Sequence, residues 1–194
     1  TGSGKTEVYM ELIAEAAGRG KQSIVLIPEI ALTYQTVMRF YHRFGDRVSI
    51  MNSKLSPGER SDQFERAKKG EIDVMIGPRS ALFTPFSNLG YIIIDEEHEG
   101  TYKSETIPRY HARETAIERA RMSGATVILG SATPSIESFY HAKKGDYLLL
   151  SMDKRVKEKP LPECEIVDLR EELKARNFSI LSRSLHEKIE QRLL

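Results

Sequence analysis

Short apolar runs alternate with longer stretches of helical spacing along most of the chain. The apolar runs predict strands at 23–27, 47–51, 73–76, 91–95, 125–129 and 147–150. The helical spacing predicts a helix after residue 6, with Val8, Leu12 and Ile13 on one face, and further helices over about 31–44, 56–69, 109–123 and 135–144. Because strands such as 91–94 are apolar on both faces, we expect an α/β fold, a mainly parallel sheet with helices on both sides.

The pattern changes after Ser151. A charged, proline-containing stretch covers 152–162, a short strand is predicted at 165–167, and a final helix from Arg183 carries Leu185, Ile189 and Leu193 on one face. We therefore interpret residues 1–150 as one α/β domain and residues 151–194 as a connector toward a further lobe.

Composition sets limits on the class of protein. The chain has 194 residues, of which 40% are hydrophobic and 29% charged, and this balance is typical of one globular domain with a core. The 29 basic and 28 acidic side chains give a net charge of +1. Overall charge therefore gives no indication of a polyanionic partner, and any nucleic-acid contact must depend on where individual charges lie.

The single cysteine and the lack of long apolar runs narrow the setting. Cys164 alone cannot form an intrachain disulfide or a cysteine-ligated zinc site, and we expect it to be a small apolar residue in a strand. No run approaches the roughly 18 apolar residues that a membrane span needs, and no secretory signal pattern is present. The sequence therefore predicts a cytoplasmic protein that does not bind a membrane.

The chain opens with a glycine-rich motif. Residues 1–6 read TGSGKT, the end of the phosphate-binding pattern G-x-x-x-x-G-K-[ST], whose first glycine would lie two positions earlier. We expect the strand that leads into this loop to be missing as well. Such a loop points backbone N–H groups at a phosphate, Lys5 reaches the β and γ phosphates, and Thr6 binds Mg²⁺. The alternative is a solvated turn. The predicted ATP-binding residues are Gly2, Ser3, Gly4, Lys5 and Thr6.

Acidic residues follow directly after the apolar strand at 91–94. The carboxyl ends of parallel strands are where ligands bind in α/β sheets. Asp95 suits a ligand to hydrated Mg²⁺, and Glu96 suits a base that positions the attacking water. A solvated acidic turn is the alternative, but it does not explain why an apolar strand ends on these residues. The predicted catalytic residues are Lys5, Asp95 and Glu96, and the predicted Mg²⁺ ligands are Thr6 and Asp95.

A third motif, Ser131-Ala132-Thr133, follows the predicted strand at 125–129. Small hydroxyl residues at a strand end can link the carboxylate site to a neighbouring lobe through hydrogen bonds. The alternative, on physical grounds at least as good, is that a hydroxyl before Pro134 caps the next helix.

The motifs GSGKT, DEEH and SAT, in this order, resemble those of superfamily 2 DNA helicases. The stretches LIPEIALT at 26–33, IGPRSALFTPF at 76–86, YHAR at 110–113 and GSATPS at 130–135 further resemble the PriA (primosomal protein N′) family. This resemblance implies a RecA-like P-loop NTPase domain, the first helicase lobe, without its first strand.

The resemblance also implies a path for single-stranded DNA. Backbone amides, hydroxyls and an arginine are suitable donors for a phosphate backbone that is bound without sequence preference. Arg79 taken alone would more often be a surface charge. The DNA-binding residues implied by the resemblance are Pro28, Glu29, Thr33, Arg79 and Ser80.

Residues 99–111, here named the aromatic loop, resemble a loop that the PriA family shares with RecQ-type helicases. Its rings can stack on bases and its cations can hold phosphates. The alternative is a polar surface loop with two packed tyrosines. The residues expected to couple DNA binding to ATP hydrolysis are Tyr102, Arg109, Tyr110 and His111 in this loop, together with Ser131, Ala132 and Thr133.

By resemblance, the expected activity is ATP-dependent 3′-to-5′ movement on DNA in replication restart and primosome assembly. The expected partners are single-stranded DNA, replication forks, other primosome proteins and single-strand binding protein. ATP and Mg²⁺ are the expected cofactors, whereas the zinc of the full-length family is not expected in this stretch. Because an arginine from a second lobe completes such sites, we expect this piece alone to be nearly inactive. A duplex-DNA translocase and a nucleotide-gated binding module without turnover are the alternatives.

Overall fold

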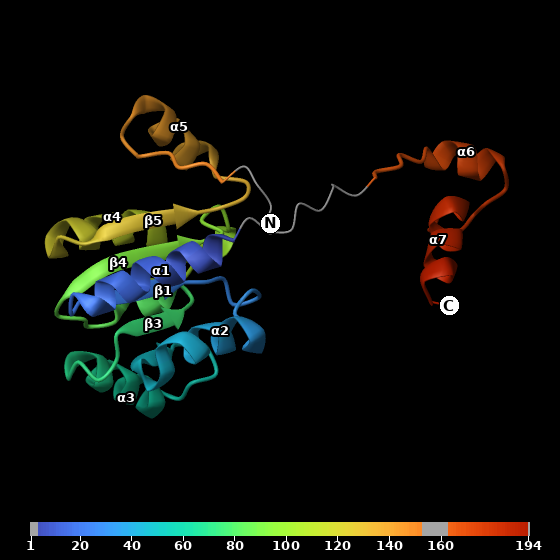
Figure 1. Cartoon of the computed structure of the whole chain (residues 1–194). Coiled ribbons are helices and arrows are strands. Elements are labelled where there is room, and N and C mark those ends of the chain that lie inside the picture. The colour runs from blue at the N-terminus through green and yellow to red at the C-terminus, as the bar shows by residue number, and fades with distance from the viewer. Residues whose placement is uncertain (1–3, 153–162, 194) are drawn as a thin grey trace. The chain divides into compact units, whose positions relative to one another are not determined.

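The computed structural model describes residues 4–152 and 163–193 (Figure 1). Its contacts divide the chain into two units, Thr1–Lys157 and Glu158–Leu194, which are described separately. Within the described ranges, no helix is both long enough and apolar enough to cross a membrane.

The first unit is built on a five-stranded, entirely parallel sheet in the order β2-β3-β1-β4-β5. The central strands β1 and β3 are buried at every position, and Ile92, Ile93 and Ile94 of β4 are fully buried. Burial on both faces is why these strands read as continuous apolar runs, and the predicted α/β fold is confirmed. The strands are β1 (Gln22–Leu26), β2 (Val48–Ile50), β3 (Val74–Gly77), β4 (Leu89–Asp95) and β5 (Thr126–Gly130).

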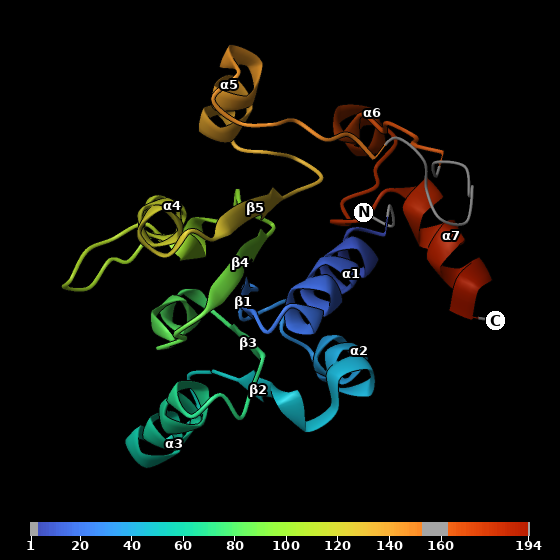
Figure 2. The ribbon, with the colours of Figure 1, turned by 60° about the vertical axis from the view of Figure 1, so that its left-hand side comes forward.

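Helices cover both faces of the sheet. One face packs on α1 and α2 through Ile13 and Phe40, and the other packs on α3, α4 and η2 through residues such as Ala67, Ala116 and Leu82. Figure 2 shows these two layers on opposite sides of the strands. The α-helices are α1 (Lys5–Gly18), α2 (Tyr34–Phe44), α3 (Pro57–Lys68), α4 (Ala112–Ser123) and α5 (Ile136–Lys144), and the 3-10 helices are η1 (Gly45–Arg47), η2 (Arg79–Phe83) and η3 (Gly100–Tyr102).

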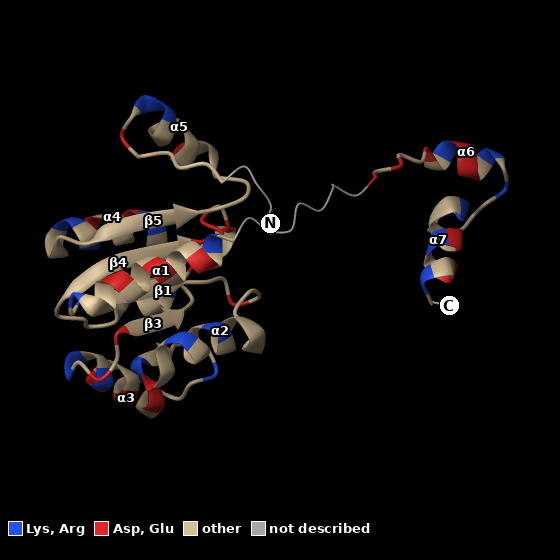
Figure 3. Ribbon diagram, in the orientation of Figure 1, with Lys and Arg blue, Asp and Glu red and all other residues tan. Residues whose placement is uncertain are grey.

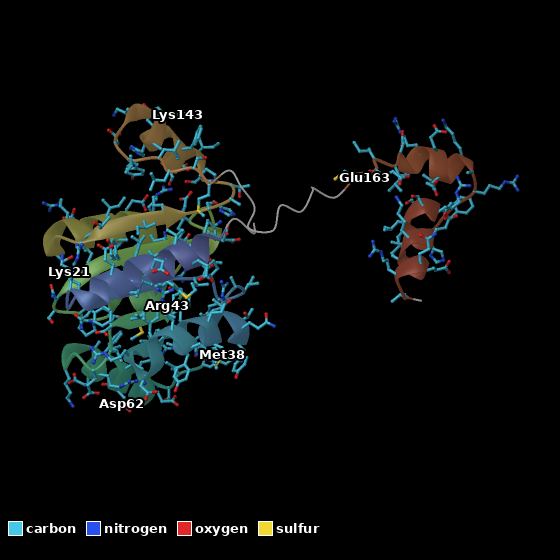
Figure 4. All side chains as sticks on the ribbon, viewed as in Figure 1. Lys21, Met38, Arg43, Asp62, Lys143 and Glu163 are labelled. Carbon is cyan, nitrogen blue, oxygen red and sulfur yellow. The ribbon has the colours of Figure 1, made fainter. Side chains whose placement is uncertain are left out.

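Opposite charges join α1 to α2. Glu7 pairs with Arg39, and Glu11 pairs with Arg43 at 2.8 Å. Figure 3 shows the acidic positions of α1 beside the basic positions of α2, and Figure 4 labels Arg43 at this junction. These largely exposed pairs add little stability, and α1 is held on the sheet mainly by its buried side chains.

Several predicted features of the first unit differ in the structure. Val8 is 42% exposed, because α1 packs through Tyr9, Met10 and Ile13 instead. The predicted helix at 31–44 begins at Tyr34, where Thr33 caps it. Residues 147–150 form no strand, and their leucines are exposed because no described strand pairs with them.

The second unit contains α6 (Leu169–Lys174) and α7 (Arg183–Leu193). The predicted final helix is confirmed, whereas α6 was not predicted. Glu172 of α6 accepts hydrogen bonds from the backbone and guanidinium of Arg183, which joins the two helices. The predicted strand at 165–167 is wrong, and Cys164 is exposed rather than part of a strand. Most of the predicted stretch 152–162 lies outside the described residues.

Candidate functional site

The candidate site begins where α1 begins, beside the carboxyl end of β4. Gly4 precedes the helix with φ 88°, a left-handed conformation that glycine adopts without steric cost. Lys5 is therefore the first residue of α1, with Thr6 directly behind it. The positive end of a helix and its free N–H groups favour an anion at this position. Gly2 and Ser3 lie outside the described residues.

Lys5 and Glu96 contact each other across the site. The Lys5 Nζ atom lies 3.0 Å from Glu96 Oε1, although the two residues are 91 positions apart in the sequence. Both side chains are partly buried. The glycine-rich motif and the acidic motif are therefore brought together at one edge of the sheet, where the sequence pattern places both.

Glu96 has an unusual backbone. Its φ of 47° is in the left-handed region, which residues other than glycine rarely adopt and which costs of order 1–3 kcal/mol. The turn is closed by a hydrogen bond of 2.9 Å from the Glu99 backbone N–H to the Glu96 carbonyl. Strain of this kind persists where the surroundings fix it, and here it aims the Glu96 side chain at Lys5.

Asp95 is partly buried and is held by Tyr9. The Tyr9 hydroxyl donates to Asp95 Oδ1 at 3.1 Å. Burial raises the pKa of Asp95, the Tyr9 hydrogen bond opposes this, and the charge of Glu96 adds to it. Burial also raises the pKa of Tyr9, which keeps this hydroxyl a neutral donor. Sequence reasoning missed Tyr9, although its spacing of four from Lys5 places both on one face of α1.

The oxygen donors at this edge fit Mg²⁺ bound to a nucleotide. Mg²⁺ is commonly held by one or two protein oxygens together with phosphate oxygens and water. Thr6 and Asp95 supply a hydroxyl and a carboxylate of that kind. In the part of the chain that the structure describes, no group of three or more His, Cys, Asp or Glu side chains is placed to hold a metal ion.

The SAT segment, residues 131–133, contacts the acidic motif through His98. The His98 Nδ1 atom lies 2.7 Å from Ser131 Oγ, and its Nε2 atom lies 3.5 Å from Thr133 Oγ1. Ala132 is exposed between them. The cap of the next helix is not a hydroxyl before Pro134 but Ser135, whose hydroxyl accepts from the Ser138 backbone N–H at the start of α5.

The residues of the implied DNA path differ in their exposure and in their contacts. Glu29, Thr33 and Ser80 are exposed, whereas Pro28 is buried and its carbonyl accepts hydrogen bonds within the following turn. The Thr33 hydroxyl caps α2. Arg79 donates through Nη1 to the carbonyls of Thr101 and Lys103, at 2.8 and 2.7 Å. In this structure Arg79 therefore holds the aromatic loop.

The aromatic loop is partly core and partly surface. Tyr102 is 1% exposed, and its hydroxyl lies 3.0 Å from the Leu26 carbonyl oxygen and 2.6 Å from that of Asp95, so it cannot stack on a base here. Arg109 is exposed. Tyr110 packs edge to face on Phe83 with ring centroids 5.2 Å apart. The His111 ring accepts from the Arg113 backbone N–H and caps α4.

The sequence of this chain matches that of a known protein family. It is the family described as DEAD/DEAH box helicase, and it matches residues 1–141. The chain belongs to this helicase family. The match includes the acidic motif, the SAT segment and the aromatic loop. The parallel sheet is accordingly the RecA-like α/β fold of these helicases.

Within the helicase family, individual proteins and solved structures are similar to this chain. The chain is 52% identical over 191 residues to replication restart protein PriA of Bacillus subtilis, covering 98% of this chain and 24% of that protein. It is 46% identical to replication restart protein PriA of Synechocystis, covering 95% and 23%. The structure of RecG bound to a three-way DNA junction aligns with a TM-score of 0.52 and 27% identity over 75% of this chain and 18% of that chain. The chain spans about a quarter of the length of these curated relatives.

A substitution at Gly130 tests the packing of this helicase site. A Cβ atom added at Gly130 would lie 1.6 Å from the Tyr9 hydroxyl oxygen, so Gly130→Ala displaces Tyr9 from Asp95. We expect it to weaken binding of a fluorescent ATP analogue with Mg²⁺ and to lower the free energy of unfolding by about 1–3 kcal/mol. Gly18→Ala is the matched control, because its Cβ would meet no atom within 4 Å. Equal binding and stability in both variants would contradict the described contact.

Proposed function

We propose that this chain is the ATP-binding lobe of an ATP-dependent DNA helicase that moves 3′ to 5′ in bacterial replication restart. The observation that carries the proposal is the 3.0 Å contact between Lys5 and Glu96, because it joins the glycine-rich motif to the carboxylate that we propose as the base. The similarity to replication restart proteins over nearly the whole chain supports the cellular role. We further propose that residues 151–194 lead toward the zinc region and second lobe of a longer cytoplasmic protein.

Each residue at the edge of the sheet has a defined part in this proposal. Lys5 binds the terminal phosphates, Thr6 and Asp95 hold Mg²⁺, and Glu96 accepts a proton from the attacking water or orients it. When bound, Mg²⁺ neutralises negative charge on the phosphates. The hydrogen bond from the Tyr9 hydroxyl keeps Asp95 oriented. Gly2, Ser3 and Gly4 of the glycine-rich motif are the further proposed ATP-binding residues.

We propose that DNA binds along the exposed side chains of Glu29, Thr33 and Ser80, with Arg109 and Tyr110 of the aromatic loop beside them. Pro28 and Arg79 act there by shaping the turn and holding the loop. Single-stranded DNA and replication forks are the proposed substrates, and other primosome proteins and single-strand binding protein are the proposed partners. His98 connects Ser131 and Thr133 of the SAT segment to the acidic motif.

A duplex-DNA translocase is the second candidate. It is favoured by the likeness to RecG, whose structure was solved on a three-way DNA junction. Such an enzyme would use the same ATP site, so the two candidates differ only in the DNA that stimulates hydrolysis. A binding module without turnover is less consistent with the position of Glu96 beside Lys5.

ATP hydrolysis by the full-length protein with no DNA, single strand, duplex and fork distinguishes these candidates. We expect single-stranded and forked DNA to stimulate hydrolysis most, and Lys5→Ala to abolish it with every DNA because the cation on the terminal phosphates is lost. Stimulation by duplex alone would support the translocase. Normal hydrolysis by Lys5→Ala would contradict the phosphate-binding role. The 194-residue piece alone should show negligible stimulation.

Glu96→Gln separates catalysis from binding. The amide keeps the shape of the carboxylate but loses its basicity, so ATP and Mg²⁺ should still bind while turnover falls by about 10²-fold or more. Equilibrium binding of a fluorescent ATP analogue and steady-state hydrolysis measure the two effects. Loss of binding together with turnover would show that Glu96 has a structural role.

Alanine substitutions of Arg109 and Tyr110 test the aromatic loop. Base stacking contributes about 1–3 kcal/mol per base, which is sufficient to bias a loop that adjoins the catalytic carboxylates. We expect these variants of the full-length protein to lose most stimulation by single-stranded DNA and much less of their DNA-free hydrolysis. Unchanged stimulation would make the loop a surface feature, and equal losses with and without DNA would make it a scaffold for the active site.

A further inference from the structure

Glu97 is a buried carboxylate that none of the roles above uses. It follows Glu96 at the end of β4 and is only 3% exposed. Its Oε1 atom accepts from the Ser135 backbone N–H at 2.6 Å. Its Oε2 atom accepts from the hydroxyls of Ser135 and Ser138, at 3.1 and 2.8 Å, and from Arg113 Nη1 at 3.3 Å. Both oxygens of a fully buried side chain are thus satisfied by four donors.

Arg113 completes this group of side chains. It lies in the first turn of α4, and its side chain is 11% exposed. Besides Glu97, its Nη1 atom donates to the hydroxyls of Ser135 and Ser138 at 2.8 and 3.0 Å. Burial acts to raise the pKa of Glu97, but the hydrogen bonds of the serines and the charge of Arg113 outweigh it and hold that pKa below its usual value. Glu97, Arg113, Ser135 and Ser138 are named the Glu97 cluster below.

The Glu97 cluster joins three segments that serve the proposed coupling. Glu97 belongs to the acidic motif at 95–98, Arg113 lies where the aromatic loop returns to α4, and Ser135 caps α5 two positions after the SAT segment. The aromatic loop therefore leaves the cluster at one end and returns to it at the other. The Glu97 backbone N–H also donates to the Gly130 carbonyl at 3.0 Å, which fixes the end of β4 against the end of β5.

Stability alone does not account for such a cluster. A buried ion pair commonly contributes no more to stability than apolar side chains of similar volume would, because burying the charges is costly. What it does supply is a defined geometry, since the two Glu97 oxygens are held by donors from both α4 and the start of α5. The segments that meet at the Glu97 cluster are those to which the proposed function assigns the response to DNA.

We propose that Glu97 is a positioning residue that fixes the aromatic loop and the SAT segment relative to Asp95 and Glu96, and so carries the effect of DNA on ATP turnover. This inference rests on the proposed function. It assigns Glu97 no contact with ATP, Mg²⁺ or DNA. The contacts of Lys5 with Glu96 and of Tyr9 with Asp95 lie outside the cluster, so we expect nucleotide binding to be independent of it.

Glu97→Gln in the full-length protein is the direct test. The side chain keeps its size, but one of the two accepting oxygens of Glu97 is replaced by an NH₂ group, which only donates. Because both oxygens of Glu97 accept hydrogen bonds, at least one of these bonds is lost. We expect the ratio of DNA-stimulated to DNA-free ATP hydrolysis to fall about tenfold or more, with an unchanged KM for ATP and an unchanged DNA-free rate. Glu114→Gln is the matched control, because Glu114 also pairs with Arg113 but is 57% exposed. It should keep the normal ratio.

Ser138→Ala provides a second, milder variant. It removes one hydroxyl donor without introducing a misplaced polar group. If Glu97→Gln does not unfold cooperatively on heating, and so is not properly folded, Ser138→Ala is the variant that tests the proposal. A smaller fall in the ratio, again with unchanged KM, is the expected result. An unchanged ratio in a folded variant would overturn the proposal. So would a parallel loss of both rates, which would make the cluster a structural support. A parent protein that DNA does not stimulate would overturn the proposed function as well.

Discussion

The parallel direction of every described strand is the constraint on which the site depends. With β4 between β1 and β5, the carboxyl ends of these strands meet at one edge. The turn after β1, the acidic motif after β4 and the SAT segment after β5 therefore lie beside one another, although they are far apart in the sequence. The start of α1 comes to the same edge, and the contact of Lys5 with Glu96 follows from this arrangement.

Hydrogen bonds of polar side chains then connect neighbouring segments at this edge. Tyr102 reaches the carbonyl oxygens at the ends of β1 and β4, and Arg79 holds the backbone of the aromatic loop. His98 reaches the SAT segment, and Glu97 reaches α4 and α5. Because Tyr102 and Glu97 are buried and need their hydrogen-bond partners, the segments that they join can move only together or by exchanging hydrogen bonds. That property suits a domain in which the binding of one ligand must alter the response to another.

The sequence predicted the sheet well because buried parallel strands are continuous apolar runs that need no knowledge of their neighbours. It failed at 147–150, where an apolar run has no described strand to pair with, and at Val8, because helical spacing does not show which face will pack. The placement of Lys5, Asp95 and Glu96 at this edge was predictable, because the motifs that contain them lie where a helix begins or a strand ends. Long-range partnerships, such as those of Tyr9 with Asp95 and Glu97 with Arg113, depend on how elements pack and leave no local signal.

The most direct test of the account is a structure of the full-length protein with ADP, Mg²⁺ and beryllium fluoride. The central claim is that the glycine-rich motif and the acidic motif form one nucleotide site at this edge of the sheet. The account predicts the nucleotide phosphates at the start of α1 within reach of Lys5, and Mg²⁺ near Thr6 and Asp95, with Glu96 facing the terminal phosphate mimic. A nucleotide bound elsewhere, or with Asp95 and Glu96 turned away from it, would contradict the claim.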